Sequence, residues 1–213
     1  MRENDPSSKN KVGEIKEDEV KKIMKVKIET RGVVLKTDGE YILEKEGEKG
    51  LKQLEAELKR LGHPIKYREI ETMAFYPAGL RALSLLAIKK TFNFDDEKIQ
   101  EMGVVATKKS LIIKLFIRYF LSVQKVFFEE APRIWQKHWT KGILTPLKLN
   151  EEKKYAILKL ENFDLHPLYC SVYLPGYFSG ILQMLIKTNK ITAQETKCSF
   201  RGDEYHEYLL KWL

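Results

Sequence analysis

CSVYLPGYFSG at residues 170–180 and ETKCSFRGDEYH at residues 195–206 are the two segments that decide which fold we expect for this chain. In the first segment, Gly176 and Gly180 lie four residues apart. On a helix these two glycines share one face, where a neighbouring backbone can approach closely. We expect this face of the helix to pack against a sheet.

The second segment predicts a β-hairpin whose turn is centred on Gly202, between strands over residues 191–199 and 205–213. Cys198 and His206 each lie four residues from Gly202, so the hairpin places them opposite each other. Residues paired across two strands have Cβ atoms about 5 Å apart, close enough for one metal ion to contact both side chains. We also expect a positive φ at Gly202, which glycine adopts without strain.

A metal site at this hairpin would need further ligands. Cys170, on the preceding helix, is the candidate third ligand, and His166 is the nearest candidate for a fourth. A zinc ion held by Cys170, Cys198 and His206 is therefore one interpretation. The other is that both cysteines are buried core residues without a function, as this residue type often is. The chain contains no Cys-x-x-Cys pair, which would be the stronger zinc signature.

Helical patterns come first along the chain and strands follow, which indicates an α+β fold with a helical N-terminal part packed on a largely C-terminal antiparallel sheet. Apolar spacing, caps and breakers predict helices over residues 47–61, 78–91, 95–102, 108–130 and, interrupted at Pro175, 170–187. Residues 155–160 read as a further strand. Asp38-Gly39, between two β-prone runs, predicts a hairpin near the N-terminus.

One folded domain accounts for most of the chain. Residues 1–24 alternate charged and small polar side chains, so we expect a flexible or partly helical charged lead there and a single ligand-binding domain over residues 25–213. The longest apolar run, residues 111–128, is interrupted by three basic residues, so we expect no membrane span. With two cysteines and no apolar N-terminal segment, we expect a cytoplasmic protein.

Positive charge is concentrated in one part of the sequence. The net charge is +8, and residues 106–141 contain eight Lys or Arg but only two Glu. These basic residues are spread along the segment, and no nucleic-acid-binding motif accompanies them. We interpret them as the solvated face of a long helix, and nucleic acid is not an expected partner.

The order and spacing of the two C-terminal segments resemble the signature of 4-vinyl-reductase domains. The matching positions are Cys170, Gly176, Gly180, Glu195-x-x-Cys198, Gly202-Asp203 and His206, the last of which is typically a third cysteine in such domains. The resemblance covers about residues 140–213. It implies the α+β sandwich shared with haem-based nitric-oxide-binding domains and Golgi-tethering (TRAPP) subunits, which hold a small apolar ligand, a haem or an acyl chain between helices and sheet. It also implies that Cys170, Cys198 and His206 form the cysteine-rich site of the family.

A ligand in such a fold would contact apolar side chains of two helices. The candidates are Leu115, Phe116, Tyr119, Phe120, Tyr173, Tyr177 and Phe178. We do not expect haem, because the Tyr-x-Ser-x-Arg signature of nitric-oxide-binding domains is missing. His138, beside Trp135 and Trp139, is interpreted as a structural histidine.

These features favour a cytoplasmic sensor or carrier domain that binds a small hydrophobic molecule or lipid and forms a homodimer. Two alternatives stay open: an oligomerisation module with a collapsed pocket, and a metal-dependent enzyme that uses Cys170, Cys198 and His206. The chain has no Gly-x-Ser-x-Gly elbow, phosphate loop or His-Glu-x-x-His motif. We therefore expect a binding protein in preference to an enzyme, and we can assign no catalytic residue.

Overall fold

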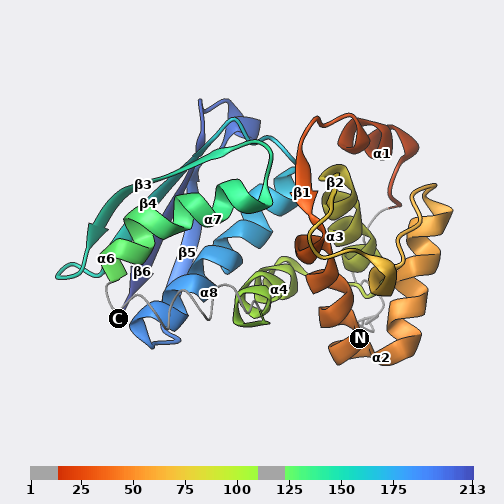
Figure 1. The fold of residues 1–213 in the computed structure, drawn as a ribbon, viewed down its shortest axis with the longest axis horizontal. Coiled ribbons are helices and arrows are strands. Elements are labelled where there is room, and N and C mark those ends of the chain that lie inside the picture. The colour runs from red at the N-terminus through yellow and green to blue at the C-terminus, as the bar shows by residue number, and fades with distance from the viewer. Residues whose placement is uncertain (1–13, 110–122) are drawn as a thin grey trace, which may run out of the picture.

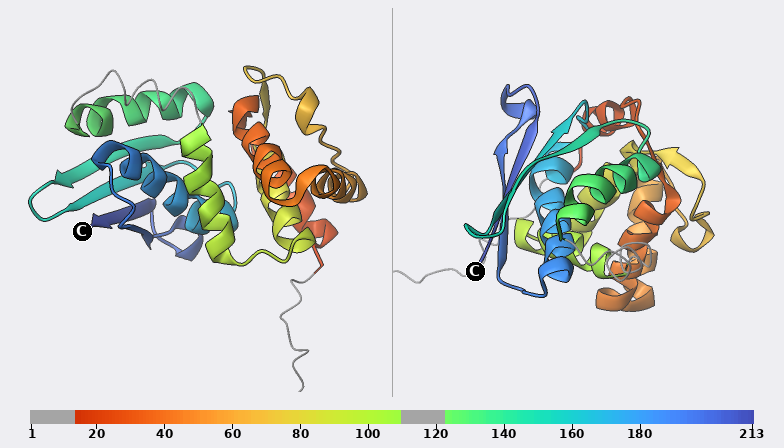
Figure 2. Two further views of the ribbon diagram at one scale, coloured as in Figure 1. Left: turned by 90° about the horizontal axis from the view of Figure 1, so that it is seen from below. Right: turned by 60° about the vertical axis from the view of Figure 1, so that its left-hand side comes forward.

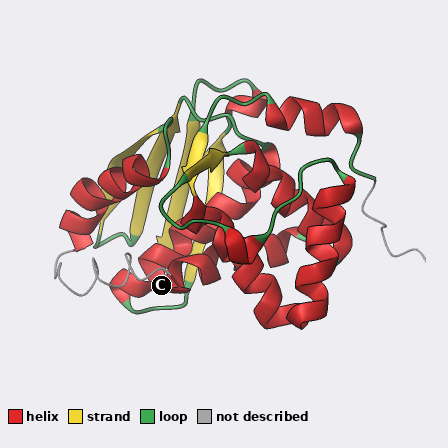
Figure 3. Cartoon of the chain, turned by 45° about the vertical axis from the view of Figure 1, so that its right-hand side comes forward, coloured by secondary structure: helices red, strands yellow, loops and turns green. Residues whose placement is uncertain are grey.

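The computed structural model of this protein describes residues 14–109 and 123–213. A helical N-terminal part lies beside a C-terminal part in which helices cover a four-stranded antiparallel sheet (Figure 1). Figure 2 and Figure 3 show the same division from other sides, with the sheet at one end of the molecule and the helices stacked beside it. This arrangement confirms the expected α+β fold. Within the described residues, no helix combines the length and the apolar character needed to cross a membrane.

The sheet has the strand order β3-β4-β6-β5. Its strands are β3 (Ile143–Asn150), β4 (Tyr155–Glu161), β5 (Ile191–Lys197) and β6 (His206–Trp212). β4, β5 and β6 confirm the three strands predicted for the last third of the chain. β3 is missing from the prediction because Pro146 breaks its pattern, and a β-bulge follows directly after that proline.

One face of the sheet is buried and the other is not. Along β4, buried residues alternate with partly exposed ones, and the same alternation occurs along β6. Leu158 and Leu210 are on the buried face, which α7 (Ala131–His138) and α8 (Leu174–Ile186) cover. Side chains on that face can therefore line a site between the helices and the sheet.

The predicted hairpin at Asp38-Gly39 is wrong, because helix α2 (Gly32–Arg60) covers both residues. Leu35, Asp38 and Ile42 are buried on one face of α2 at helical spacing. Gly39 is small for a packing reason: a Cβ atom there would lie 2.6 Å from the Cβ atom of Tyr67. The Asp-Gly pair thus lies where α2 packs against the short 3₁₀ helix η1 (Tyr67–Glu69), and it does not form a turn.

Helix α2 changes direction at Gly47, whose φ of +68° and ψ of −170° are not helical. The part beyond this kink confirms the helix predicted over residues 47–61, with Leu51, Leu54 and Leu58 buried. In the N-terminal part, β1 (Glu29–Arg31) pairs with β2 (Phe75–Pro77) in antiparallel fashion, and Thr30 of β1 also forms an isolated bridge with Trp139.

The N-terminal lead is more ordered than the charge pattern indicates. Helix α1 (Glu17–Met24) buries Val20 and Ile23 against α3 (Gly79–Thr91). The lead, predicted to be flexible or partly helical, is therefore helical and packed from Glu17 to Met24, while residues 1–13 lie outside the described part of the chain. α3 itself confirms the helix predicted over residues 78–91.

The two parts of the molecule meet where α4 (Asp96–Lys109) packs against α8. A Cβ atom at Gly176 would overlap the carbonyl oxygen of Gln100, and one at Gly180 would overlap the Thr107 side chain. The glycine strip is therefore used for close approach, as predicted, but its neighbour is helix α4. The expectation that this strip packs on the sheet is wrong.

Helix α4 is also longer than predicted. Gly103 lies inside the helix instead of ending it. A glycine is needed there for packing, because a Cβ atom would lie 2.5 Å from the Tyr173 carbonyl oxygen. The later part of the helix predicted over residues 108–130 appears as α6 (Val123–Lys125) and the π-helical turn η2 (Val126–Glu130), which runs into α7. Pro132 stands in the first turn of α7, where a missing N–H is tolerated.

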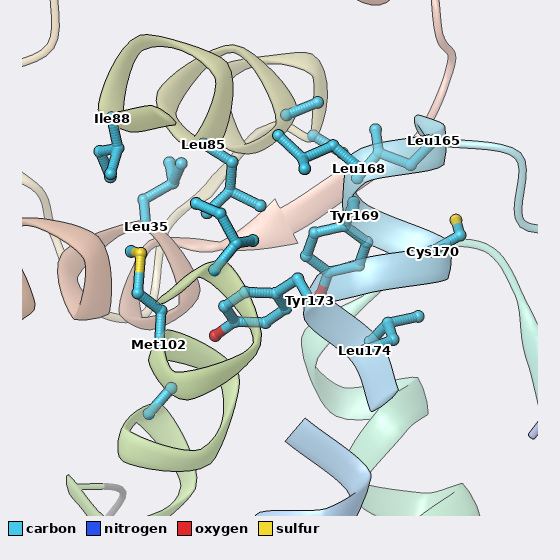
Figure 4. Close-up of a cluster of buried hydrophobic side chains, with 14 of the residues drawn as sticks. Leu35, Leu85, Ile88, Met102, Leu165, Leu168, Tyr169, Cys170, Tyr173 and Leu174 are labelled. Atoms are coloured by element: carbon cyan, nitrogen blue, oxygen red, sulfur yellow. The ribbon is translucent and has the colours of Figure 1, made fainter. Parts of the chain in front are cut away.

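The helical stretch before the last hairpin begins with a π-helical turn, η3 (Leu168–Tyr173), and continues as α8. Pro175 lies in the first turn of α8 and does not interrupt the stretch, contrary to the prediction. The core connects this segment to the N-terminal helices: Figure 4 shows Leu35, Leu85 and Met102 in one buried cluster with Tyr169 and Tyr173. Burial of each such side chain contributes about 1.5–3 kcal/mol of hydrophobic free energy.

Candidate functional site

A cavity of about 430 Å³ lies between the first half of α2, the π turn η3, helices α7 and α8, and the buried face of the sheet. Most of its wall is apolar. Six of the residues that form this wall are Phe127, Trp135, Leu144, Leu158, Phe178 and Leu182. A volume of this size can accommodate a small organic ligand. The structure therefore does not support the alternative of a collapsed pocket.

Aromatic rings form one continuous side of the cavity. Trp135 and Trp139 stack with ring centroids 5.5 Å apart, and Tyr169 and Tyr173 stack at 5.2 Å. Trp139 joins the two pairs, since its ring centroid lies 5.5 Å from that of Tyr169. Four of the residues that line the cavity are thus held by ring contacts, which gives this side a defined shape before any ligand binds.

Polar and charged side chains on the wall of the cavity come mainly from α2 and adjoin the tyrosine side, where Thr37 interacts with the Tyr173 hydroxyl. Lys36, Thr37 and Glu40 project from one face of α2, and Lys109 comes from the end of α4. We call these four residues the polar edge, and aliphatic residues of α8 and of the sheet line other parts of the cavity. The cavity is therefore amphipathic: it has a large apolar body and one side with ionisable groups.

His138 lies on the cavity wall at the end of α7. Its Nδ1 atom lies 2.8 Å from the carbonyl oxygen of Ile134, one helical turn earlier. Burial lowers the pKa of His138, and this effect outweighs the opposing hydrogen bond to Ile134. A neutral ring with its Nδ1–H donated to a backbone carbonyl has Nε2 as its acceptor nitrogen, the state in which an imidazole binds a metal.

A buried ion pair lies behind the tyrosine side of the cavity. The Arg81 guanidinium, which is 0% exposed, pairs with the Asp38 carboxylate, which is 1% exposed. Burial raises the pKa of Asp38, although Arg81 and a 2.7 Å hydrogen bond from Ser84 oppose this shift. The guanidinium carbon of Arg81 lies 4.5 Å from the ring centroid of Tyr173, so α2, α3 and the cavity wall share one buried charge network.

Cys198 and His206 meet at the end of the last hairpin, as the sequence predicts. Their ligand atoms and a carboxylate oxygen of Glu195 all lie within 4.8 Å of one another. We call these three residues the β5–β6 cluster. His206 Nδ1 lies 2.7 Å from Glu195 Oε1, and its Nε2 lies 2.8 Å from the hydroxyl oxygen of Ser199, in the 3₁₀ turn η4 (Ser199–Arg201). Gly202 follows with a φ of +98°, which confirms the predicted turn.

The β5–β6 cluster differs from the predicted ligand set in two residues. Cys170 is not part of it: its thiol lies 3.7 Å from the Phe163 carbonyl oxygen, and burial raises its pKa to about 12. His166 is also absent, because its Nε2 atom is 3.6 Å from Glu19 on α1. Glu195 takes their place. Although burial raises the pKa of Glu195, hydrogen bonds involving His206, Ser171 and Cys198 lower it, so the carboxylate is ionised.

Glu195 could have been found from the sequence. It stands in the quoted Glu-x-x-Cys segment, three residues before Cys198. The signal is weak because two residues three apart on a strand point to opposite faces. The register shift between Glu195 and Lys197 supplies the extra residue that brings Glu195 and Cys198 to the same side.

Three of the predicted pocket residues, Tyr173, Tyr177 and Phe178, line the cavity. The other four, Leu115, Phe116, Tyr119 and Phe120, lie outside the described residues. The cavity residues of α2 are missing from the sequence prediction, because this segment is predicted as a hairpin. His138, which the sequence indicates as a structural histidine, also lies on the cavity wall.

No family model and no curated protein matches this sequence. Several solved structures share its fold. An H-NOX protein from S. oneidensis in the Fe(II)NO ligation state has a TM-score of 0.64 at 11% identity, over 86% of this chain and 99% of that one. A Cs H-NOX mutant has a TM-score of 0.60 at 15% identity, over 85% of this chain and 96% of that one. An Fe(II) unliganded H-NOX mutant from K. algicida has a TM-score of 0.60 at 6% identity, over 86% and 96%.

These structures confirm the part of the predicted relationship that concerns the fold of the nitric-oxide-binding domains. They do not test the closer resemblance to 4-vinyl-reductase domains or TRAPP subunits. They do correct the prediction about haem. Two further structures with this fold are described as studies of haem redox potential and porphyrin distortion, and of haem distortion in the H-NOX family. The expectation that haem is not bound is therefore wrong as an argument from the fold. The absence of the Tyr-x-Ser-x-Arg signature does not exclude haem, and the interpretation of His138 as a structural histidine does not exclude it either.

Proposed function

We propose that this chain is a sensor domain that binds a small hydrophobic molecule in the cavity between α2, α7, α8 and the sheet. The observation that carries the proposal is the cavity itself, about 430 Å³ in volume and lined mainly by apolar side chains. Transfer of a ligand from water into such a site contributes about 25 cal/mol for each Å² of apolar surface removed from water. The aromatic side provides a wall whose shape is set before binding.

A filled-cavity variant tests this proposal. Ile181 lines the cavity from α8, whereas Gln183, two residues later, is partly exposed and does not. We expect N-phenylnaphthylamine, a neutral apolar dye, to bind the protein with an increase in fluorescence. Ile181→Trp should lose that binding, because the indole occupies the cavity, and Gln183→Trp should keep it. Equal binding by both variants would place the dye elsewhere and contradict the proposal.

Haem is a second candidate ligand, and His138 is the observation that favours it. The described residues that line the cavity include one histidine, His138, whose neutral ring suits an axial ligand. Bound haem would supply an iron centre for a diatomic gas, while Trp135 and Trp139 would pack beside the porphyrin. Titration with hemin should then give a Soret band that moves in His138→Leu. The same change at His63, which does not line the cavity, should leave the band unchanged; identical spectra for both variants would remove His138 as the ligand.

The β5–β6 cluster supports a separate proposal, a metal ion held by Glu195, Cys198 and His206. A carboxylate, a thiol and an imidazole within 4.8 Å of one another need only small movements to share one ion. Elemental analysis of protein purified without chelator should find a metal that is lost in His206→Gln. It should be retained in Cys170→Ser, because Cys170 lies outside the cluster. Metal loss in both variants would indicate the ligand set predicted from sequence, and no metal in the parent protein would end the proposal.

We also propose that the protein forms a homodimer and is located in the cytoplasm. Light scattering on purified protein distinguishes a dimer from a monomer directly. The enzyme alternative based on Cys170, Cys198 and His206 has less support, because Cys170 does not join the other two side chains. We retain the binding function as the proposal.

A further inference from the structure

Lys36 is a partly buried lysine on the wall of the cavity. It lies in the second turn of α2, beside Thr37, and Val33 and Glu40 continue the same helix face. Among the described residues, no carboxylate forms an ion pair with its ammonium group. Its ammonium group is therefore a positive charge on the cavity wall that a ligand can pair with.

The second lysine of the polar edge shows the contrast. Lys109 pairs with the Glu44 carboxylate and also lies 3.4 Å from the Glu40 carbonyl oxygen. Its charge is therefore compensated within the protein. The remaining acidic group on the cavity wall, Glu40, has an exposed side chain and forms no ion pair with Lys36. Among the described residues, the polar edge thus contains one unpaired lysine, Lys36, and one unpaired but exposed carboxylate, Glu40.

The rest of the wall favours an apolar ligand body over a second ion. Away from the polar edge, the lining includes Ile181, Leu182 and Leu185 of α8 and Leu158 and Leu210 of the sheet. Burial raises the pKa of Tyr177 and of Tyr173. Both phenols therefore stay protonated, and the Tyr173 hydroxyl already interacts with Thr37 of the polar edge.

From this arrangement we infer that the ligand is an apolar molecule with an acidic group, oriented with its carboxylate toward Lys36 on α2 and its apolar body between α8 and the sheet. The inference rests on the proposed binding function and names the ligand class of the same site. A fatty or aromatic acid has this chemistry, and so do the propionates of a haem. Lys36 selects the acid over its neutral analogue, because only the ionised group can form an ion pair with the ammonium group.

A matched pair of ligands tests the inference: lauric acid and lauryl alcohol, which share the alkyl chain and differ in the acidic group. Each is measured by its displacement of N-phenylnaphthylamine at a pH where the acid is ionised. We expect the parent protein to bind the acid more tightly than the alcohol by about tenfold or more. Lys36→Met should remove this preference by weakening the acid alone, and Lys36→Arg should retain most of it.

The control for net charge is Lys52→Met, which removes the same charge from an exposed position on α2 that does not line the cavity. It should leave both affinities unchanged. If the parent binds acid and alcohol equally, or if Lys36→Met weakens both to the same extent, the acidic ligand is wrong while the apolar cavity stands. If the alcohol also fails to bind, the proposed function fails, and this inference fails with it.

Absorption spectroscopy and mass spectrometry of the protein as purified identify the source of the acid. A Soret band identifies haem propionates, and a carboxylic acid in the organic extract, detected by mass spectrometry, identifies a fatty or aromatic acid. Either result supports the inference. Recovery of a neutral molecule alone, bound in proportion to the protein, contradicts it.

Discussion

At the scale of single residues, Gly202 shows how one backbone conformation places a site. Its φ of +98° allows η4 to turn back into β6, so that Cys198 and His206 meet. A Cβ atom at Gly202 would have no neighbour within 4 Å, so the cost of a larger side chain is conformational and not steric. A β-branched residue is the least compatible with a positive φ.

We expect Gly202→Val to lower the free energy of unfolding by at least about 1–2 kcal/mol, the cost of a non-glycine residue in the left-handed region. Gly202→Asn should cost less, because asparagine adopts this region more readily. Urea unfolding of the two variants measures the difference. A valine variant as stable as the parent protein would contradict the turn.

His138 gives a pH dependence at the same scale. Its pKa is lowered in the folded protein by burial, so the unfolded chain binds a proton more readily. The contribution of His138 to stability is therefore complete above its unfolded pKa of about 6.5 and is lost as the pH falls through the folded pKa. His138→Gln should lose less stability than the parent protein between neutral and mildly acidic pH. The comparison with the parent matters because burial also lowers the pKa of His166; parallel stability curves for the two proteins would contradict a shifted His138.

At the scale of elements, the crossing of α4 and α8 depends on backbone contact. Gly176 faces the Gln100 carbonyl and Gly103 faces the Tyr173 carbonyl, so each helix has a glycine where the other approaches. α8 also forms part of the cavity wall, and this crossing therefore sets the width of the cavity.

Gly176→Ala distinguishes this contact from helix propensity. In an open helix, replacing glycine with alanine would stabilise by about 1 kcal/mol. Here the new methyl group would overlap the Gln100 carbonyl oxygen, and overpacking of this kind costs about 1–3 kcal/mol. We expect a net loss of stability and weaker dye binding. Gln183→Ala on the same helix, whose side chain is partly exposed, should change neither by much; a stabilised Gly176→Ala protein would show that the helices separate without cost.

At the scale of the whole molecule, the Asp38–Arg81 pair connects the N-terminal helices to the cavity. The pair joins α2 to α3, and Arg81 lies over the ring of Tyr173 in η3. Removal of a single partner from a fully buried pair leaves an uncompensated charge, which is more costly than the absence of both charges. Surface pairs such as Lys89–Asp96 carry no such cost.

We therefore expect Asp38→Asn to lower the free energy of unfolding by about 3–5 kcal/mol. The double variant Asp38→Leu with Arg81→Met should recover much of that loss, because no buried charge remains. Asp96→Asn, which opens a surface pair, should change stability by no more than about 1 kcal/mol. Thermal unfolding of the three proteins ranks their stabilities. Equal losses for Asp38→Asn and Asp96→Asn would show that an unpaired charge at the buried site is no more costly than one at the surface.

The sequence by itself determined the elements whose geometry is local. The strand spacing around Gly202 brings Cys198 opposite His206 because a hairpin pairs residues at equal distances from its turn. The helix over residues 78–91 follows from apolar periodicity, which the structure confirms as α3.

Only the tertiary structure decided the features that depend on distant segments. Asp38-Gly39 has the composition of a turn, yet it lies in a helix because Arg81 and Tyr67 pack against it from elsewhere in the chain. The polar edge with Lys36 was missed for the same reason. The glycine strip at residues 176 and 180 predicts close approach but not its partner, since a sequence pattern specifies a face and not what covers it. The cavity is formed where these long-range contacts leave space between helices and sheet, so its lining could be read only from the assembled fold.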